Sequence, residues 1–83
     1  MWAMPTVRRF GSTRYFFFSN EGSEPPHIHV EQGEALAKFW LEPVALAAQS
    51  GFPSHKLRKI QMVVTAHQRA FLEAWREHFR TNT

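Results

Sequence analysis

The sequence contains no cysteine, which excludes a disulfide framework, thiolate chemistry and zinc sites built on cysteine. It has no apolar run near the roughly 20 residues that a membrane helix needs, and its N-terminus lacks the apolar core of a signal peptide. With 83 residues there is room for one small domain and no second. We therefore expect one cytoplasmic domain over residues 1–83, with no contact to a membrane.

Positive charge is concentrated toward the C-terminal end. Residues 1–52 carry four basic and five acidic side chains, whereas residues 53–83 carry six basic and two acidic ones. The net charge of +3 and the pI near 10.0 therefore come from the C-terminal segment. A basic element of this kind suits RNA, DNA or an acidic partner protein, and it is also typical of an ordinary solvated helix.

The N-terminal segment has the pattern of a β-hairpin. Residues 5–10 and 14–18 are rich in aromatic and β-branched side chains, and Gly11 begins the turn between them. Residues 19–26 contain a glycine and two consecutive prolines, which predict a loop. Because proline cannot continue a central strand, the next strand is expected to begin at His27.

Residues 27–31 and 35–41 predict a second hairpin that turns at residues 32–33 and places His27 opposite Lys38. Side chains alternate between the faces of a strand, so the two faces can be listed. The apolar face is the predicted core: Ile28, Val30, Ala35, Ala37, Phe39 and Leu41. The other face is polar with two large apolar members: His27, His29, Glu31, Glu34, Leu36, Lys38 and Trp40.

The C-terminal part has helical spacing. Pro43 is expected to end the sheet, residues 44–49 to form a turn or two of helix, and Ser54 to be the N-cap of a helix over residues 54–80. That helix would be about 40 Å long, whereas a strand of five to eight residues is only about 17–27 Å long. Either the helix breaks or its apolar stripe extends beyond the sheet, and we favour the second. The predicted class is α+β, with about four antiparallel strands in two hairpins and one long C-terminal helix on one face.

The two histidines of the segment PHIHV are the leading candidates for chemistry. On one strand face, His27 and His29 would lie roughly 7 Å apart at Cβ. One imidazole as base and the other as acid could move a ribose hydroxyl proton and protonate a leaving oxygen. Lys38 could stabilise charge that develops on the phosphate. These residues predict a metal-independent, ribonuclease-like catalytic set.

Two other interpretations of the histidine pair stay open. Histidines on a half-exposed strand are often polar surface or partner contacts. The spacing also suits a divalent metal, which would need a third ligand such as Glu31, and nothing in the sequence fixes one. The favoured hypothesis includes no metal and no cofactor.

Further candidates for contacts with a substrate or partner are Tyr15, Asn20, Glu21, Trp40, Arg69 and Arg76. The aromatic run that begins at Tyr15 could stack on bases, although such a run more often forms core and dimer contacts. Glu21 could orient an imidazole, and Arg69 and Arg76 belong to a basic stripe of the predicted helix.

The segments RYFFFSNEG (14–22), EPPHIHV (24–30) and AKFWLEPV (37–44) resemble the small bacterial family called domain of unknown function 4160. The resemblance covers residues 4–79, and the proline–histidine segment is its most specific part. Members often begin at the Met-Pro-Thr stretch, which implies that residues 1–3 are a disordered N-terminal extension. The positions that match its motifs are Tyr15, Asn20, Glu21, His27, His29, Lys38 and Trp40.

The resemblance brings no catalytic role with it. Members are often encoded beside another small family of unknown function, an arrangement similar to a toxin–antitoxin pair. We therefore predict a component of such a pair that acts on RNA or on a small partner protein through the face carrying His27, His29 and Lys38. We also expect a homodimer. The alternatives are a non-catalytic module that binds protein or nucleic acid, and a small metal-binding protein with histidine ligands.

Overall fold

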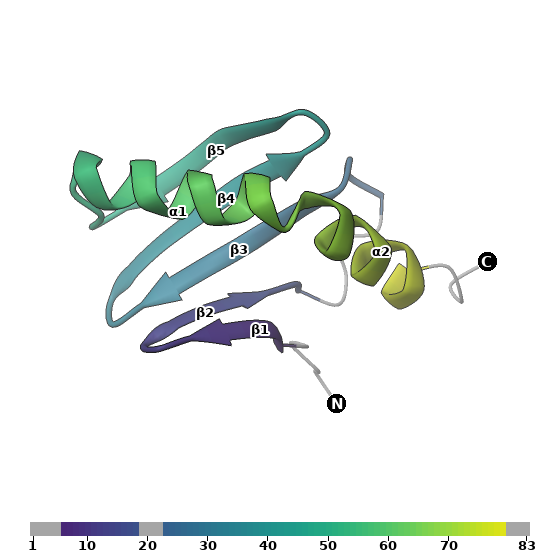
Figure 1. Cartoon of the computed structure of the whole chain (residues 1–83), viewed down its shortest axis with the longest axis horizontal. Coiled ribbons are helices and arrows are strands. Elements are labelled where there is room, and N and C mark those ends of the chain that lie inside the picture. Colours follow the sequence, from purple (N-terminus) through teal and green to yellow (C-terminus); the bar gives the residue numbers. More distant parts are fainter. Residues whose placement is uncertain (1–5, 19–22, 80–83) are drawn as a thin grey trace.

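The computed structural model describes residues 6–18 and 23–79, and over these ranges the chain forms a five-stranded antiparallel sheet followed by two helices (Figure 1). The elements are β1 (Thr6–Phe10), β2 (Thr13–Phe16), β3 (His27–Gln32), β4 (Ala35–Leu41), β5 (Val44–Ser50), α1 (Ser54–Ala66) and α2 (Gln68–Phe79). The strands lie side by side in sequence order, and α1 and α2 pack on one face of the sheet. The predicted α+β class is confirmed. The predicted extension at residues 1–3 lies outside the described residues.

The β3–β4 hairpin forms as predicted, but its register differs by two residues. Gln32 pairs with Ala35, so the turn consists of Gly33 and Glu34. Gly33 has a φ of +59° at the first turn position, where a type II′ turn favours glycine. The shift places Trp40, and not Lys38, opposite His27. Because it equals a full side-chain period, the shift leaves the alternation of faces along both strands unchanged, and only Glu34 moves from a strand face into the turn.

The prediction of helical turns over residues 44–49 is wrong, since this segment is the edge strand β5. Glu42 and Pro43 form the tight turn that leads from β4 into it, and Leu41 pairs with Val44. Proline therefore occupies the connection and does not end the sheet. A helix of six residues would be marginal in water. As a strand, the segment forms backbone hydrogen bonds with β4 along one of its edges.

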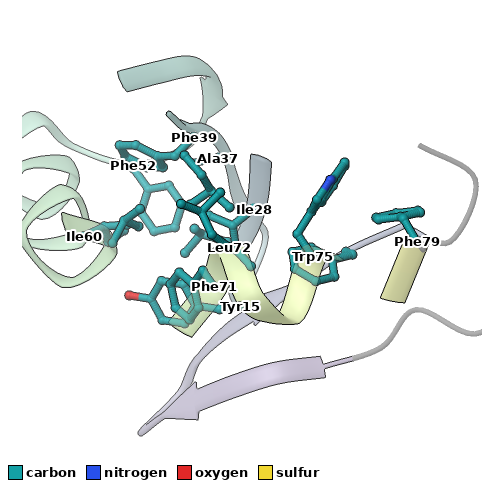
Figure 2. Close-up of a cluster of buried hydrophobic side chains, with 14 residues drawn as sticks. Tyr15, Ile28, Ala37, Phe39, Phe52, Ile60, Phe71, Leu72, Trp75 and Phe79 are labelled. Carbon is teal, nitrogen blue, oxygen red and sulfur yellow. The ribbon is translucent and has the colours of Figure 1, made fainter. Parts of the chain in front are cut away.

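The core lies between the sheet and the helices (Figure 2). From the predicted core face, Ile28, Val30, Ala37, Phe39 and Leu41 are all buried, and Ala35 packs against them while partly exposed. The opposing layer comes from the helices: Ile60, Val64, Phe71, Leu72, Trp75 and Phe79. The hydrophobic pattern of the strands thus predicted the buried side of the sheet correctly.

The C-terminal helix breaks at His67, so the expected overhang does not occur. His67 has backbone angles of −108° and 17°, and α2 restarts where the Phe71 amide donates to the His67 carbonyl at 2.9 Å. The side-chain amide of Gln68 donates to the Leu41 carbonyl at 2.6 Å, which attaches the start of α2 to the end of β4. The change of direction, visible in Figure 1, keeps the apolar side of α2 on the sheet.

Ser54 is the first helical residue and not the N-cap. Pro53 precedes α1 in an extended conformation and provides no side-chain cap, while its carbonyl accepts from the amides of Lys56 and Leu57. Within the described ranges, no helix is both long enough and apolar enough to cross a membrane.

We predict that Gly51→Ala lowers the free energy of unfolding by about 2–3 kcal/mol. Gly51 has a φ of +91°, and an added Cβ would lie 3.2 Å from both Cα and Cβ of Ala35. Gly11→Ala is the control, because Gly11 also has a positive φ (+57°) but no atom within 4 Å of the added Cβ. It should cost about 1 kcal/mol. Urea denaturation measures both, and equal losses would contradict the predicted clash.

Candidate functional site

The face of the sheet away from the helices is called here the open face. The strand pairings place the following residues on it: Arg14, Phe16, His29, Glu31, Leu36, Lys38, Trp40, Ala45, Ala48 and Ser50. Leu36 retains 48% of its surface, and the neighbouring Phe18 retains 37%. An open face with large apolar side chains is unusual for a domain this small and marks it as a candidate binding surface.

His27 is fully buried at the start of β3. Its Nδ1 donates to the Pro25 carbonyl at 3.0 Å, and because a carbonyl only accepts, this bond places a proton on Nδ1. The His27 ring lies 4.8 Å from the Trp75 ring of α2 and 5.8 Å from the Trp40 ring. This imidazole therefore holds elements together in the structure as it stands.

The two prolines before β3 act as acceptors for this arrangement. While the Pro25 carbonyl accepts from His27, the Pro26 carbonyl accepts from the Leu41 amide at 3.0 Å. Proline has no amide hydrogen, so neither residue has a backbone donor that needs an acceptor. Their carbonyls accept hydrogen bonds from neighbouring elements. The segment thus joins the entry of β3 to the end of β4.

Glu24 links the loop to the open face. Its Oε1 accepts from Lys38 Nζ at 2.7 Å and lies 3.8 Å from His27 Nδ1. Lys38 Nζ also lies 4.7 Å from the centroid of the Trp40 ring, within the range of a cation–π contact. The predicted grouping of His27, Lys38 and Trp40 is observed, with Glu24 as a member that the sequence pattern did not single out.

His29 is half-buried and lies opposite Lys38. Its ring stacks on Phe16 at 5.5 Å and meets the edge of Phe18 at 4.5 Å, and it lies 5.0 Å from the ring of His27. The two histidines are therefore adjacent, as the strand spacing predicted, but only His29 reaches the surface.

A hollow of about 380 Å³ opens on this face between β2 and β5. Phe16, Phe18, His29, Leu36, Lys38 and Ala48 contribute to its lining, which is largely apolar. At one side, the Arg14 guanidinium lies 4.3 Å from the Phe16 ring and forms an ion pair with Glu31 at 3.1 Å. Ala48 and its neighbours in β5 could not be predicted here, because that segment was expected to be helical.

The other predicted site residues lie elsewhere. Tyr15 points to the buried face, opposite Val30. Arg69 and Arg76 are exposed on α2, and Arg76 Nη2 lies 3.8 Å from Glu42 Oε2. Asn20 and Glu21 lie outside the described residues. The structure therefore does not place Tyr15 or the two arginines beside the histidines.

Glu31, the example of a third metal ligand, forms an ion pair with Arg14. Among residues 6–18 and 23–79, no group of three or more histidines and carboxylates is placed to hold a metal ion.

We predict that His27→Ala lowers the free energy of unfolding by about 2–4 kcal/mol, through lost burial and the unsatisfied Pro25 carbonyl. His29→Ala is the control, because the half-buried His29 ring should cost only about 1 kcal/mol. Chemical denaturation of both variants measures the difference. A stable His27→Ala protein would show that the ring has no structural role.

Burial raises the pKa of Tyr15 above its ordinary value of 10.0. The folded state therefore binds this proton more tightly than the unfolded state. This contribution to stability is present below pH 10.0 and is lost as the pH rises through the folded-state value. Since Tyr15 is the single tyrosine, absorbance of tyrosinate at increasing pH reports on it alone. We expect a higher midpoint for folded than for urea-unfolded protein, and a lower one would contradict the burial of the hydroxyl.

Comparison with protein-family models gives one finding. The model described as Domain of unknown function (DUF4160) matches residues 13–76, which include β2 to β5, α1 and most of α2. No curated protein and no solved structure matches the chain. The family match covers more than half of the chain and includes the proline–histidine segment, so the earlier resemblance is confirmed. The chain belongs to the DUF4160 family.

Proposed function

We propose that this chain is a binding module that takes up an extended, acidic segment of a small partner protein along β5 and the adjoining hollow of the open face. The observation that carries the proposal is an uncharged edge strand directly beside an apolar hollow.

Strand β5 is the edge of the sheet that carries no charged side chain. Its sequence, VALAAQS, contains neither charge nor proline, and its last five residues are exposed. The opposite edge, β1, carries Arg8 and Arg9. Both edge pairings contain an irregularity in register, so charge is what distinguishes the two edges. Charged side chains hinder the pairing of an edge with another chain, and the uncharged β5 is therefore the edge better suited to accept another strand.

The hollow offers a place for the side chains of that strand. Ala48, Gln49 and Ser50 of β5 form one wall of the hollow, so a strand added to β5 would run beside it. Every second side chain of an added strand points to the open face. An apolar side chain there would cover Leu36 of β4, which is the most exposed large apolar residue in the lining of the hollow.

Charge favours an acidic partner. The chain carries a net charge of +3, which comes from residues 53–83. On the open face, Lys38 lines the hollow and Arg14 lies over Phe16 of its lining. Both cations already have carboxylate partners within the chain. The contribution of charge is therefore long-range attraction that raises the association rate, and the apolar contacts hold the complex.

A protein segment suits this surface better than an RNA chain. The hollow is largely apolar, and the imidazole of His27 has no exposed surface with which to exchange a proton with a substrate. The ribonuclease-like set of His27, His29 and Lys38 stays a prediction that would require the chain around His27 to move. A partner within a toxin–antitoxin-type pair is one setting for the proposed binding.

The first experiment identifies what lies on the open face. A photo-crosslinking amino acid replaces Leu36 in one variant and Met62 in another, and both are irradiated in cells of the source organism. Met62 is the control, because it is 71% exposed on α1, away from the open face. We expect position 36 alone to crosslink to one small acidic protein. Crosslinks only to RNA, only to a second copy of this chain, or equally from both positions would overturn the proposal.

The second experiment measures affinity for the purified crosslinked partner. We predict that Leu36→Glu weakens binding at least about tenfold, because it places a carboxylate in the apolar contact and repels an acidic segment. Met62→Glu introduces the same charge at an exposed apolar site and should change the affinity less than about twofold. Circular dichroism verifies that both variants are folded. Equal effects of the two substitutions would show that only net charge matters.

A further inference from the structure

A second hollow lies on the helix side of the sheet, between the β1–β2 hairpin and α1. It measures about 310 Å³, at the low end of the range of roughly 300–1,000 Å³ for small-molecule sites. Phe10 and Tyr15 line it from the hairpin, and Lys56, Lys59 and Val63 line it from α1. It has no lining residue in common with the hollow of the open face.

Tyr15 is a buried polar side chain whose hydroxyl has no hydrogen-bond partner among residues 6–18 and 23–79. The residue is only 2% exposed, and its hydroxyl forms no hydrogen bond with any residue in the described part of the chain. In the described part of the chain, every side-chain nitrogen or oxygen that is fully enclosed has a hydrogen-bond partner. Since the Tyr15 oxygen has none, it is not fully enclosed and must border open space. In Figure 2 the hydroxyl points to the side where α1 carries Ile60, which also lines this hollow.

The wall opposite Tyr15 is cationic. Lys56 and Lys59 lie in the first two turns of α1, together with His55, and the first turn contains no acidic residue. No carboxylate in the described ranges forms an ion pair with either lysine. The positive end of the helix dipole adds to this uncompensated charge.

The remaining walls are apolar. The Phe10 ring is 38% exposed and is held edge-on to Tyr15 at 5.8 Å, and Ile60 and Val63 continue the surface along α1. A ligand that fills this hollow would therefore need a flat apolar body and an anionic group at the end near the lysines.

We propose that the hollow binds a small aromatic anion, in which a ring packs on Phe10 and Val63 and a phosphate or carboxylate lies between Tyr15, Lys56 and Lys59. The Tyr15 hydroxyl donates to an oxygen of the anionic group, and the ammonium groups neutralise it. The ordinary pKa of tyrosine, 10.0, already keeps the hydroxyl protonated at neutral pH, and burial raises the pKa of Tyr15 further, so the hydroxyl can donate.

Calorimetry of phenyl phosphate binding tests the proposal. Inorganic phosphate serves as a probe of the anion site alone, and benzyl alcohol as a probe of the apolar walls alone. We expect saturable binding of phenyl phosphate, at least about tenfold tighter than either half. Failure to saturate by about 10 mM would overturn the site. Equal binding of inorganic phosphate would show surface charge only, and equal binding of benzyl alcohol would show an apolar crevice without an anion site.

Three variants assign the contacts. Tyr15→Phe removes only the hydroxyl and should weaken binding about tenfold, as for a hydrogen bond to a charged group. Lys59→Gln should weaken it about fivefold, whereas the matched Arg58→Gln should stay within about twofold, because Arg58 lines a different surface of α1. Equal effects at residues 58 and 59, or no effect of Tyr15→Phe in a folded protein, would contradict the proposed geometry.

Discussion

The packing of α2 against β2 and β3 is the contact on which the rest of this small structure depends. Phe71 stacks on Tyr15 at 5.7 Å, and Trp75 meets the edge of Phe17 at 5.3 Å and lies 4.8 Å from His27. A domain of 83 residues has a thin core, so a few large rings provide much of its apolar burial. The same helix thereby contacts His27, which lies beside His29 of the open face, and Tyr15 of the hollow beside α1.

Covering one face of a sheet leaves the other face in contact with solvent, and here that face is aromatic. Cationic side chains partly cover its rings, with Arg14 over Phe16 and Lys38 over Trp40. Such side chains pack their aliphatic stems on apolar surface and keep their charge in water. The ion pairs of these cations with Glu31 and Glu24 then limit their movement. The result is an apolar surface with a polar rim, which is the general form of a protein interface.

The proline–histidine segment gains a physical explanation from these contacts. Its proline carbonyls accept hydrogen bonds from His27 and from the Leu41 amide, and the Gln68 side chain then binds the Leu41 carbonyl. The loop, β3, β4 and α2 are thus joined at one end of the sheet. A motif with two histidines suggests proton transfer, but a buried imidazole bonded to a carbonyl stabilises this junction. The surface beside it, around His29 and Leu36, remains accessible, and it is the surface that we propose for partner binding.

The sequence by itself determined the α+β class, the family and the buried side of the central strands, because side-chain alternation is a local property that survives even a two-residue error in register. It also identified His27, His29, Lys38 and Trp40 as neighbours. Only the tertiary structure decided that residues 44–49 form an edge strand, that the helix breaks at His67, and that the His27 ring is enclosed. Each of these depends on contacts between segments far apart in the chain: pairing with β4, the limited length of the sheet, and the position of Trp75. Local spacing contains no information about such contacts.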